Sequence, residues 1–302
     1  MSRDPYTAHA DFIRPATACT DMRRVLVMVA GFELAFWFAP VIVGLLLPEP
    51  LRNGYVEGTS AFATLLQFGT FGITALIFVR MLQRVHGRGF WSLIGPPEPA
   101  MTSVWRVTLA VGAVLLALEI LPPWIAFAEL AEVRSLLRWV AFLPLALVVL
   151  VIQVTTEEIY FRGYLQQQLA VRSSSRILWM GLPSLIFGLS HYYNGIGPAD
   201  STLYVIWATA LGLACADLTA RSGNLGAAIG LHLANNAFAL LLVGIAGWPA
   251  SGLALFLYPA FDPADYDYSL RALATLGGVL EILSSVAMVF VLWLAARIAI
   301  RR

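Results

Sequence analysis

The chain of 302 residues is 59% hydrophobic and only 12% charged, and its formal net charge is +1. Soluble domains carry about 25% charged residues, so this composition indicates a multi-spanning membrane protein. The near-neutral charge gives no indication of a nucleic-acid partner, and the two distant cysteines, Cys19 and Cys215, argue against a disulfide framework. All nineteen basic residues are arginine, which excludes a catalytic lysine.

Eight apolar stretches are predicted to cross the lipid bilayer, whose hydrocarbon core needs about 20 helical residues. They lie near 25–47, 61–82, 104–121, 137–154, 177–193, 202–219, 225–246 and 275–298. The first is too long for the apolar part of a signal peptide, so we expect it to remain in the mature protein. The sequence therefore predicts an all-α polytopic membrane bundle with one domain over 1–302, an N-terminal arm at 1–24 and a motif-bearing core at 155–240.

Arginine placement predicts the orientation of these spans. Arginines gather in the N-terminal arm, in alternate connections and at the C-terminus: Arg14, Arg23, Arg24, Arg84, Arg88, Arg172, Arg176, Arg221, Arg297 and Arg301. By the positive-inside rule, these segments face the cytoplasm. We expect a protein of the plasma or inner membrane with both termini in the cytoplasm, which agrees with an even number of spans.

Two adjacent glutamates, Glu157 and Glu158, end the apolar run of the fourth span. A carboxylate in hydrocarbon costs about 2.5 to 3.5 kcal/mol on insertion scales, so the pair suggests a function. Glu158 precedes Arg162 by four residues, the favourable order for a helical ion pair, whereas Glu157 points about 100° away. We expect Arg162 to hold Glu158 and leave Glu157 available to water; the alternative is a purely structural ion pair.

A histidine in the next span is predicted to reach the depth of Glu157. If the fourth helix ends near Arg172 and the fifth begins at Arg176, Glu157 and His191 each lie fifteen residues from the turn. At 1.5 Å per residue this is about 22 Å for both, so antiparallel packing would bring them together. The alternative for His191 is an ordinary packing role.

The seventh span carries His232 and Asn236, which are four residues apart and share one helical face. An imidazole and a carboxamide on one stripe can bind a metal, polarise a carbonyl or hydrogen-bond across a bundle. Gly226 and Gly230 on the same helix predict close helix packing.

These motifs, Glu157-Glu158-x-x-x-Arg162, Phe187-x-x-x-His191 and His232-x-x-x-Asn236, resemble those of the CAAX protease and bacteriocin-processing family of intramembrane endopeptidases. The family is related to the CAAX prenyl endopeptidases. The resemblance covers about 80 residues and implies hydrolysis of a peptide bond in a membrane-associated protein or peptide.

The resemblance also implies roles for the site residues. Glu157, assisted by His191, would act as general base. His232 and Asn236 would stabilise the oxyanion. Glu158 and Arg162 would hold the helix. A zinc-dependent alternative would use Glu157, His191 and His232 as ligands. Asparagine is a poor zinc ligand and the sequence has no His-Glu-x-x-His motif, so we favour the reaction without a cofactor.

Two other classes of function remain open at this point. A transporter could use Glu33, Glu157 and Glu158 to relay ions, although no inverted repeat is visible. A scaffold could bind a partner membrane protein without turnover. Glu33, which lies within the first span, is expected either on an ion path or in an interhelical hydrogen bond.

Overall fold

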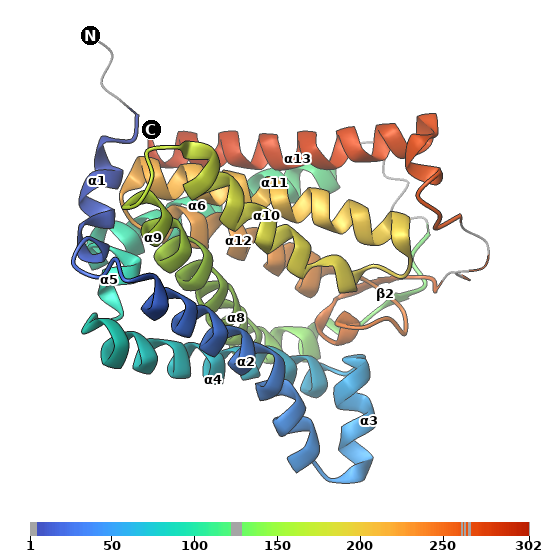
Figure 1. Ribbon diagram of the computed structural model, residues 1–302. Coiled ribbons are helices and arrows are strands. Elements are labelled where there is room, and N and C mark those ends of the chain that lie inside the picture. Colours follow the sequence, from blue (N-terminus) through green and yellow to red (C-terminus); the bar gives the residue numbers. More distant parts are fainter. Residues whose placement is uncertain (1–4, 122–128, 261, 263, 265–266, 302) are drawn as a thin grey trace.

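The computed structural model describes residues 5–121, 129–260, 262, 264 and 267–301. These parts form a bundle of long helices with short helices and loops at its ends (Figure 1), which confirms the predicted polytopic all-α class. Among the described residues, six helices are long and apolar enough to cross a membrane: α2 (Met22–Leu46), α4 (Ala61–His86), α6 (Pro97–Ile120), α8 with its continuation to α9 (Leu136–Ala170), α11 (Pro198–Ser222) and α13 (Leu276–Ile300).

The two remaining predicted spans are helical but shorter. A π-helical turn (Ile177–Gly181) leads into α10 (Leu182–Ser190), and α12 (Gly226–Ala237) continues into a π-helical turn (Phe238–Leu242). The count of eight crossing helices is thus confirmed for six and stays a prediction for these two. Short α-helices are α1 (Thr7–Ile13), α3 (Glu49–Glu57) and α5 (Trp91–Ile94), and 3-10 turns lie at Arg14–Ala16, Tyr192–Asn194, Ser251–Leu253 and Ala272–Ala274.

A small sheet was not predicted from the sequence. It has the order β1-β3-β2, with β1 (Glu132–Val133) antiparallel and β2 (Val243–Ile245) parallel to β3 (Phe256–Tyr258). The predicted span 225–246 was therefore too long. Its helix ends at Leu242 because the next three residues pair their backbone with β3.

Side-chain caps fix where several long helices begin. Asp21 accepts a hydrogen bond from the backbone N–H of Arg23 at 2.9 Å at the start of α2, and Ser60 does the same for Ala63 at 3.2 Å at the start of α4. Such caps satisfy amides that have no partner within the helix. The helix surfaces then present apolar side chains outwards, as bilayer contact requires; Leu137, for example, is 82% exposed.

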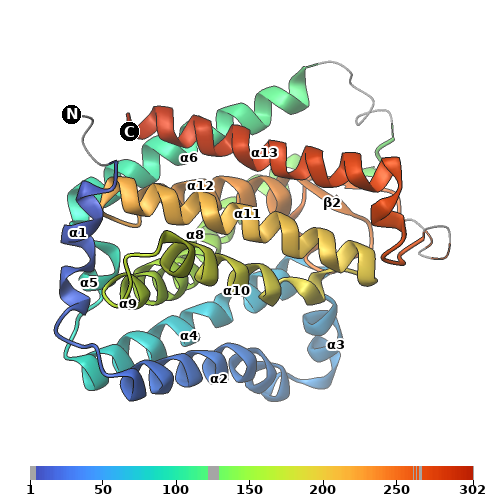
Figure 2. The ribbon, with the colours of Figure 1, turned by 45° about the horizontal axis from the view of Figure 1, so that its top comes forward.

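The first and the last described parts of the chain lie at the same end of the bundle. The first described residues and the end of α13 are close together in both views (Figures 1 and 2). The start of α13 and the small sheet lie at the opposite end. An even number of crossings has this consequence, so the arrangement is consistent with the predicted topology.

Helix α12 is the most enclosed long element, and glycine permits its position. It packs against α6, α8 and α11, and every residue from Gly226 to Ala234 is buried. A Cβ atom on Gly226 would lie 2.0 Å from the carbonyl oxygen of Ala100, and one on Gly230 would lie 2.8 Å from that of Val104. The predicted packing role of these glycines is confirmed, and it places His232 inside the bundle.

The N-terminal arm docks onto the bundle through α1. The ring of His9 stacks on Trp179 with centroids 4.4 Å apart, and the amide nitrogen of Gln166 lies 3.4 Å from His9 Nε2. The Tyr6 hydroxyl donates to Asp217 at 2.6 Å. The arm thereby connects the end of the α8–α9 helix with α10 and α11.

We predict that Gly226→Ala destabilises the protein, because its new methyl group meets backbone rather than a movable side chain. Overpacking of this kind costs about 1 to 3 kcal/mol. Thermal unfolding of the purified protein in detergent measures the loss. Gly112→Ala in α6, where a Cβ meets nothing within 4 Å, is the matched control and should unfold at or above the wild-type temperature. Equal destabilisation by both substitutions would contradict the packing argument.

We also predict that α1 docking weakens in acid. Burial lowers the pKa of His9 from its ordinary 6.5 to about 4, because the charged imidazolium is disfavoured there. Since the folded pKa lies below the unfolded one, this stabilisation is complete above pH 6.5 and is lost as the pH falls towards 4. The melting temperatures of wild type and His9→Gln, compared between pH 7.5 and 4.5, should converge in acid. A difference that is constant with pH would exclude His9 as the titrating group.

Candidate active site

The acidic pair lies on α8 where the helix changes its geometry. Glu157 and Glu158 are 8% and 0% exposed, and the chain turns into a π-helix at Phe161–Gln166 directly after them. A π-helix has more residues per turn than an α-helix, and short π-helical turns are often found at functional sites. The wider turn contains Arg162, so it determines where this guanidinium lies relative to the pair.

Glu158 is the centre of a buried polar network. Its Oε1 accepts a hydrogen bond from Arg162 Nη1 at 3.0 Å and lies 2.9 Å from His232 Nδ1. All three side chains are at most 2% exposed. The predicted i, i+4 pair is therefore present, and it extends to α12 through His232. Because the sequence gives no direct signal for a contact between α8 and α12, this third member was not predicted.

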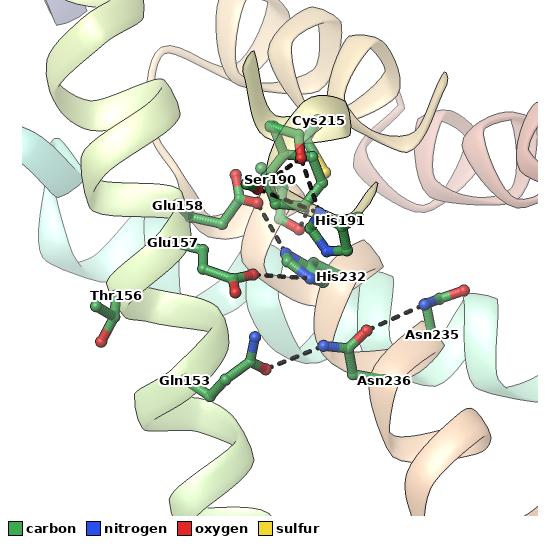
Figure 3. Close-up of polar contacts among 12 residues, drawn as sticks. Gln153, Thr156, Glu157, Glu158, Ser190, His191, Cys215, His232, Asn235 and Asn236 are labelled. Carbon is green, nitrogen blue, oxygen red and sulfur yellow. Dashed lines mark hydrogen bonds and ion pairs between the residues drawn. The ribbon is translucent and has the colours of Figure 1, made fainter. Parts of the chain in front are cut away.

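Glu157 approaches the same imidazole from its other side. Its Oε2 lies 3.4 Å from His232 Nε2, an ion-pair distance without the geometry of a hydrogen bond. Figure 3 shows both carboxylates projecting from α8 towards the His232 ring, each joined to it by a dashed line. Because a carboxylate only accepts hydrogen bonds, His232 Nδ1 donates to Glu158, and Nε2 faces Glu157 without a hydrogen bond.

His191 caps the C-terminal end of α10 beside this network (Figure 3). Its backbone has φ −90° and ψ 0°, a sparsely populated region in which active-site residues are found. Its Nδ1 lies 2.7 Å from the carbonyl oxygen of Phe187, which can only accept. Nδ1 must therefore carry the proton, and in the neutral ring Nε2 is left as a base.

Phe187 explains the first position of the Phe-x-x-x-His motif. Its ring centroid is 4.5 Å from that of His191 and 5.6 Å from that of His232, so it separates and orients both imidazoles. The guanidinium carbon of Arg162 also lies 4.5 Å from this ring. The structure describes no hydrogen bond between Glu157 and His191, so their predicted cooperation is left as a proposal.

Asn236 faces α8 one helical turn away from the glutamates. Its Nδ2 donates to Gln153 Oε1 at 3.0 Å, and its Oδ1 accepts from Asn235 Nδ2 at 3.1 Å. Gln153 was not considered in the sequence analysis. The signal was available, because Gln153 precedes Glu157 by four residues and is a polar amide within the apolar run.

Close packing behind the network keeps Arg162 in place. A Cβ atom on Gly212 of α11 would lie 2.8 Å from Arg162 Nη2 and 3.0 Å from Ser184 Cβ. A Cβ atom on Gly188 would lie 2.0 Å from Thr209 Oγ1. These glycines let α10 and α11 approach each other closely enough to enclose the guanidinium.

Comparison with known proteins gives one match. Residues 139–238 match the model of the type II CAAX prenyl endopeptidase Rce1-like family, and this range holds all three motifs. The resemblance is confirmed: residues 139–238 are Rce1-like. No curated protein and no solved structure matches the chain. With the six apolar helices, the match supports an integral membrane protein of the protease class.

The Rce1-like segment does not offer a metal centre of ordinary composition. Among the described residues, no three His, Cys, Asp or Glu side chains are arranged to hold a metal ion, which includes the alternative set Glu157, His191 and His232. Both nitrogens of His232 face carboxylates instead. The three-ligand arrangement of the zinc alternative is thus not found among the described residues.

Glu33 of α2 contacts the Rce1-like segment through Tyr160 of α8. The Tyr160 hydroxyl donates to Glu33 Oε1 at 3.0 Å, and the Tyr160 ring stacks on Phe32 with centroids 3.6 Å apart. Of the two expectations for Glu33, the interhelical hydrogen bond is the one observed. It ties α2 to the helix that carries the acidic pair.

We predict that Arg162→Met strongly destabilises the protein, because it leaves Glu158 buried with one cationic partner fewer. Breaking a buried ion pair costs about 3 to 5 kcal/mol. Thermal unfolding in detergent should show this loss, whereas Arg221→Met, which breaks the more exposed i, i+4 pair with Asp217, should cost less. The larger loss for Arg221→Met would argue against a central role for the buried pair.

Proposed function

We propose that the protein is an intramembrane endopeptidase that hydrolyses a peptide bond of a membrane-associated protein or peptide. The observation that carries this proposal is the imidazole of His232 between two buried carboxylates, within a segment that is Rce1-like. Apolar helices surround the cluster, so such a polar group would be costly without a use. A transporter or a silent scaffold has no specific observation in its favour.

In the proposed reaction, Glu157 accepts a proton from a water molecule that attacks the scissile carbonyl carbon. Glu157 is the more suitable glutamate because Glu158 is committed to Arg162 and His232. The contact of Glu157 with His232 is longer than a hydrogen bond, which leaves its carboxylate able to bind water. A positioned general base of this type contributes about 10²- to 10⁴-fold to a rate.

The developing oxyanion requires donors that are already in place. Asn236 donates one amide proton to Gln153 and has a second to offer. Nε2 of His232, which carries a proton when the ring is an imidazolium, makes no hydrogen bond with Glu157 and could donate as well. His191 Nε2 would carry the proton from Glu157 to the leaving amine, so that the C–N bond breaks with its nitrogen protonated. Both His191 and Asn236 are only partly buried, which allows a substrate to reach them.

We also propose that both termini face the cytoplasm. Two observations support this orientation, namely the shared location of the chain ends and the arginines that flank them, among them Arg24 and Arg297.

We predict that Glu157→Gln and His191→Gln each lower peptide cleavage about 10²-fold or more, because each removes a proton acceptor. The assay uses purified protein in detergent with a library of membrane-anchored peptides. Deletion-strain proteomics, which detects accumulating precursors, supplies candidates for that library.

Glu33→Gln is the matched control, since it makes the same chemical change to a glutamate of α2 that contacts α8 through Tyr160. This variant should cleave at the wild-type rate, and a chelator should leave that rate unchanged. Wild-type cleavage by Glu157→Gln would remove the general base from the proposal. Activity that is lost on chelation and restored by zinc would overturn the metal-free reaction.

A further inference from the structure

A cavity lies far from the acidic pair. It has a volume of about 300 Å³ and is lined by the first residues of α4 and α8 and by the segment Gly252–Ala254. Glu157 lies nineteen residues beyond Arg138 on the same helix, about 28 Å at 1.5 Å per residue. The cavity is therefore separate from the candidate active site.

Two arginines line this cavity, and one of them has a structural task. Arg134 Nη1 donates to the carbonyl oxygens of Ser251 at 2.7 Å and Gly252 at 2.8 Å, and Arg134 Nε lies 3.9 Å from Glu132 Oε1. These contacts hold the loop that forms one wall. Arg134 is thus occupied, and Glu132, which also lines the cavity, is its counter-charge.

Arg138 has no such task. Arg138 also lines the cavity, and its guanidinium has no partner among the residues that the structure describes. It lies in the first turn of α8, where the helix dipole is positive and a cation is disfavoured, and that turn contains no acidic residue. The cavity therefore has an excess of positive charge that an anion would balance.

The surroundings of Arg138 are those of a membrane interface. Trp139 also lines the cavity and donates its indole N–H to the carbonyl oxygen of Leu241 at 2.8 Å, as an interfacial aromatic side chain does. Phe142 and Leu145 follow Arg138 on the same face of α8 and are 43% and 53% exposed. The cationic side chain of Arg138 is thus followed along the helix by an apolar stripe.

We propose that this cavity binds the anionic headgroup of a phospholipid in the leaflet opposite the chain termini. The phosphate would accept hydrogen bonds from the Arg138 guanidinium, which suits the planar geometry of its donors. The acyl chains would lie along Phe142 and Leu145. The proposal is independent of peptidase activity, because it concerns the other end of the bundle.

Binding is tested with delipidated, purified full-length protein in detergent micelles doped with phosphatidylglycerol or phosphatidylcholine. Native mass spectrometry counts the bound lipid. We expect the wild type to retain one phosphatidylglycerol in preference to phosphatidylcholine, and Arg138→Gln to bind it about tenfold more weakly. Arg271→Gln, which removes an exposed arginine near the start of α13, is the matched control and should bind as the wild type does.

Three outcomes would overturn the proposal. One is equal phosphatidylglycerol retention by wild type and Arg138→Gln, and another is an equal loss in Arg271→Gln. The third is displacement of the lipid by millimolar inorganic phosphate alone, which would identify a phosphate site instead. Thermal unfolding of each variant checks that its fold is intact, and Arg138→Lys, which keeps the charge, should retain part of the preference.

Discussion

The hydrogen-bonded contact of Glu158 with Arg162 and His232 is the constraint on which the centre of this bundle depends. It places a carboxylate, a guanidinium and an imidazole where almost no solvent reaches them. Such groups are tolerated only when their partners are held closely, because each unpaired charge costs several kcal/mol in this setting. The glycines of α11 and α12 are a consequence of this requirement, since they let the backbones approach and enclose the polar side chains.

The same network separates the roles of two neighbouring glutamates. Glu158 has a structural role, because one of its oxygens contacts both the Arg162 guanidinium and the His232 imidazole. Glu157 shares that imidazole only at 3.4 Å and keeps more access to the surroundings. Two carboxylates that are adjacent in the sequence thus differ in environment: Glu158 has two close partners, and Glu157 has one longer contact. Environment-driven division of labour between paired carboxylates is a general feature of hydrolytic sites.

Much of the fold and part of the candidate site could be predicted from sequence patterns, and the features that could not be predicted have physical reasons. The long apolar runs, the Glu158–Arg162 pair and the turn after Arg172 follow from local periodicity and spacing. The contact of His232 with both glutamates depends on how α12 packs on α8, which no local pattern specifies. The end of the π-helical turn after α12, at Leu242, was missed for a similar reason, because strand pairing with residues further along the chain replaced the last predicted helical turn.

The 35-residue helix Leu136–Ala170 bears on where water enters. Glu157 lies about 32 Å from the first residue of this helix and about 20 Å from the last, at 1.5 Å per residue. The helix is longer than a hydrocarbon core of about 30 Å, and Glu157 lies nearer to the helix end beside which both ends of the described chain lie. For the proposed peptidase, the shorter route along this helix for water, and for a cut polar fragment, would run to that end.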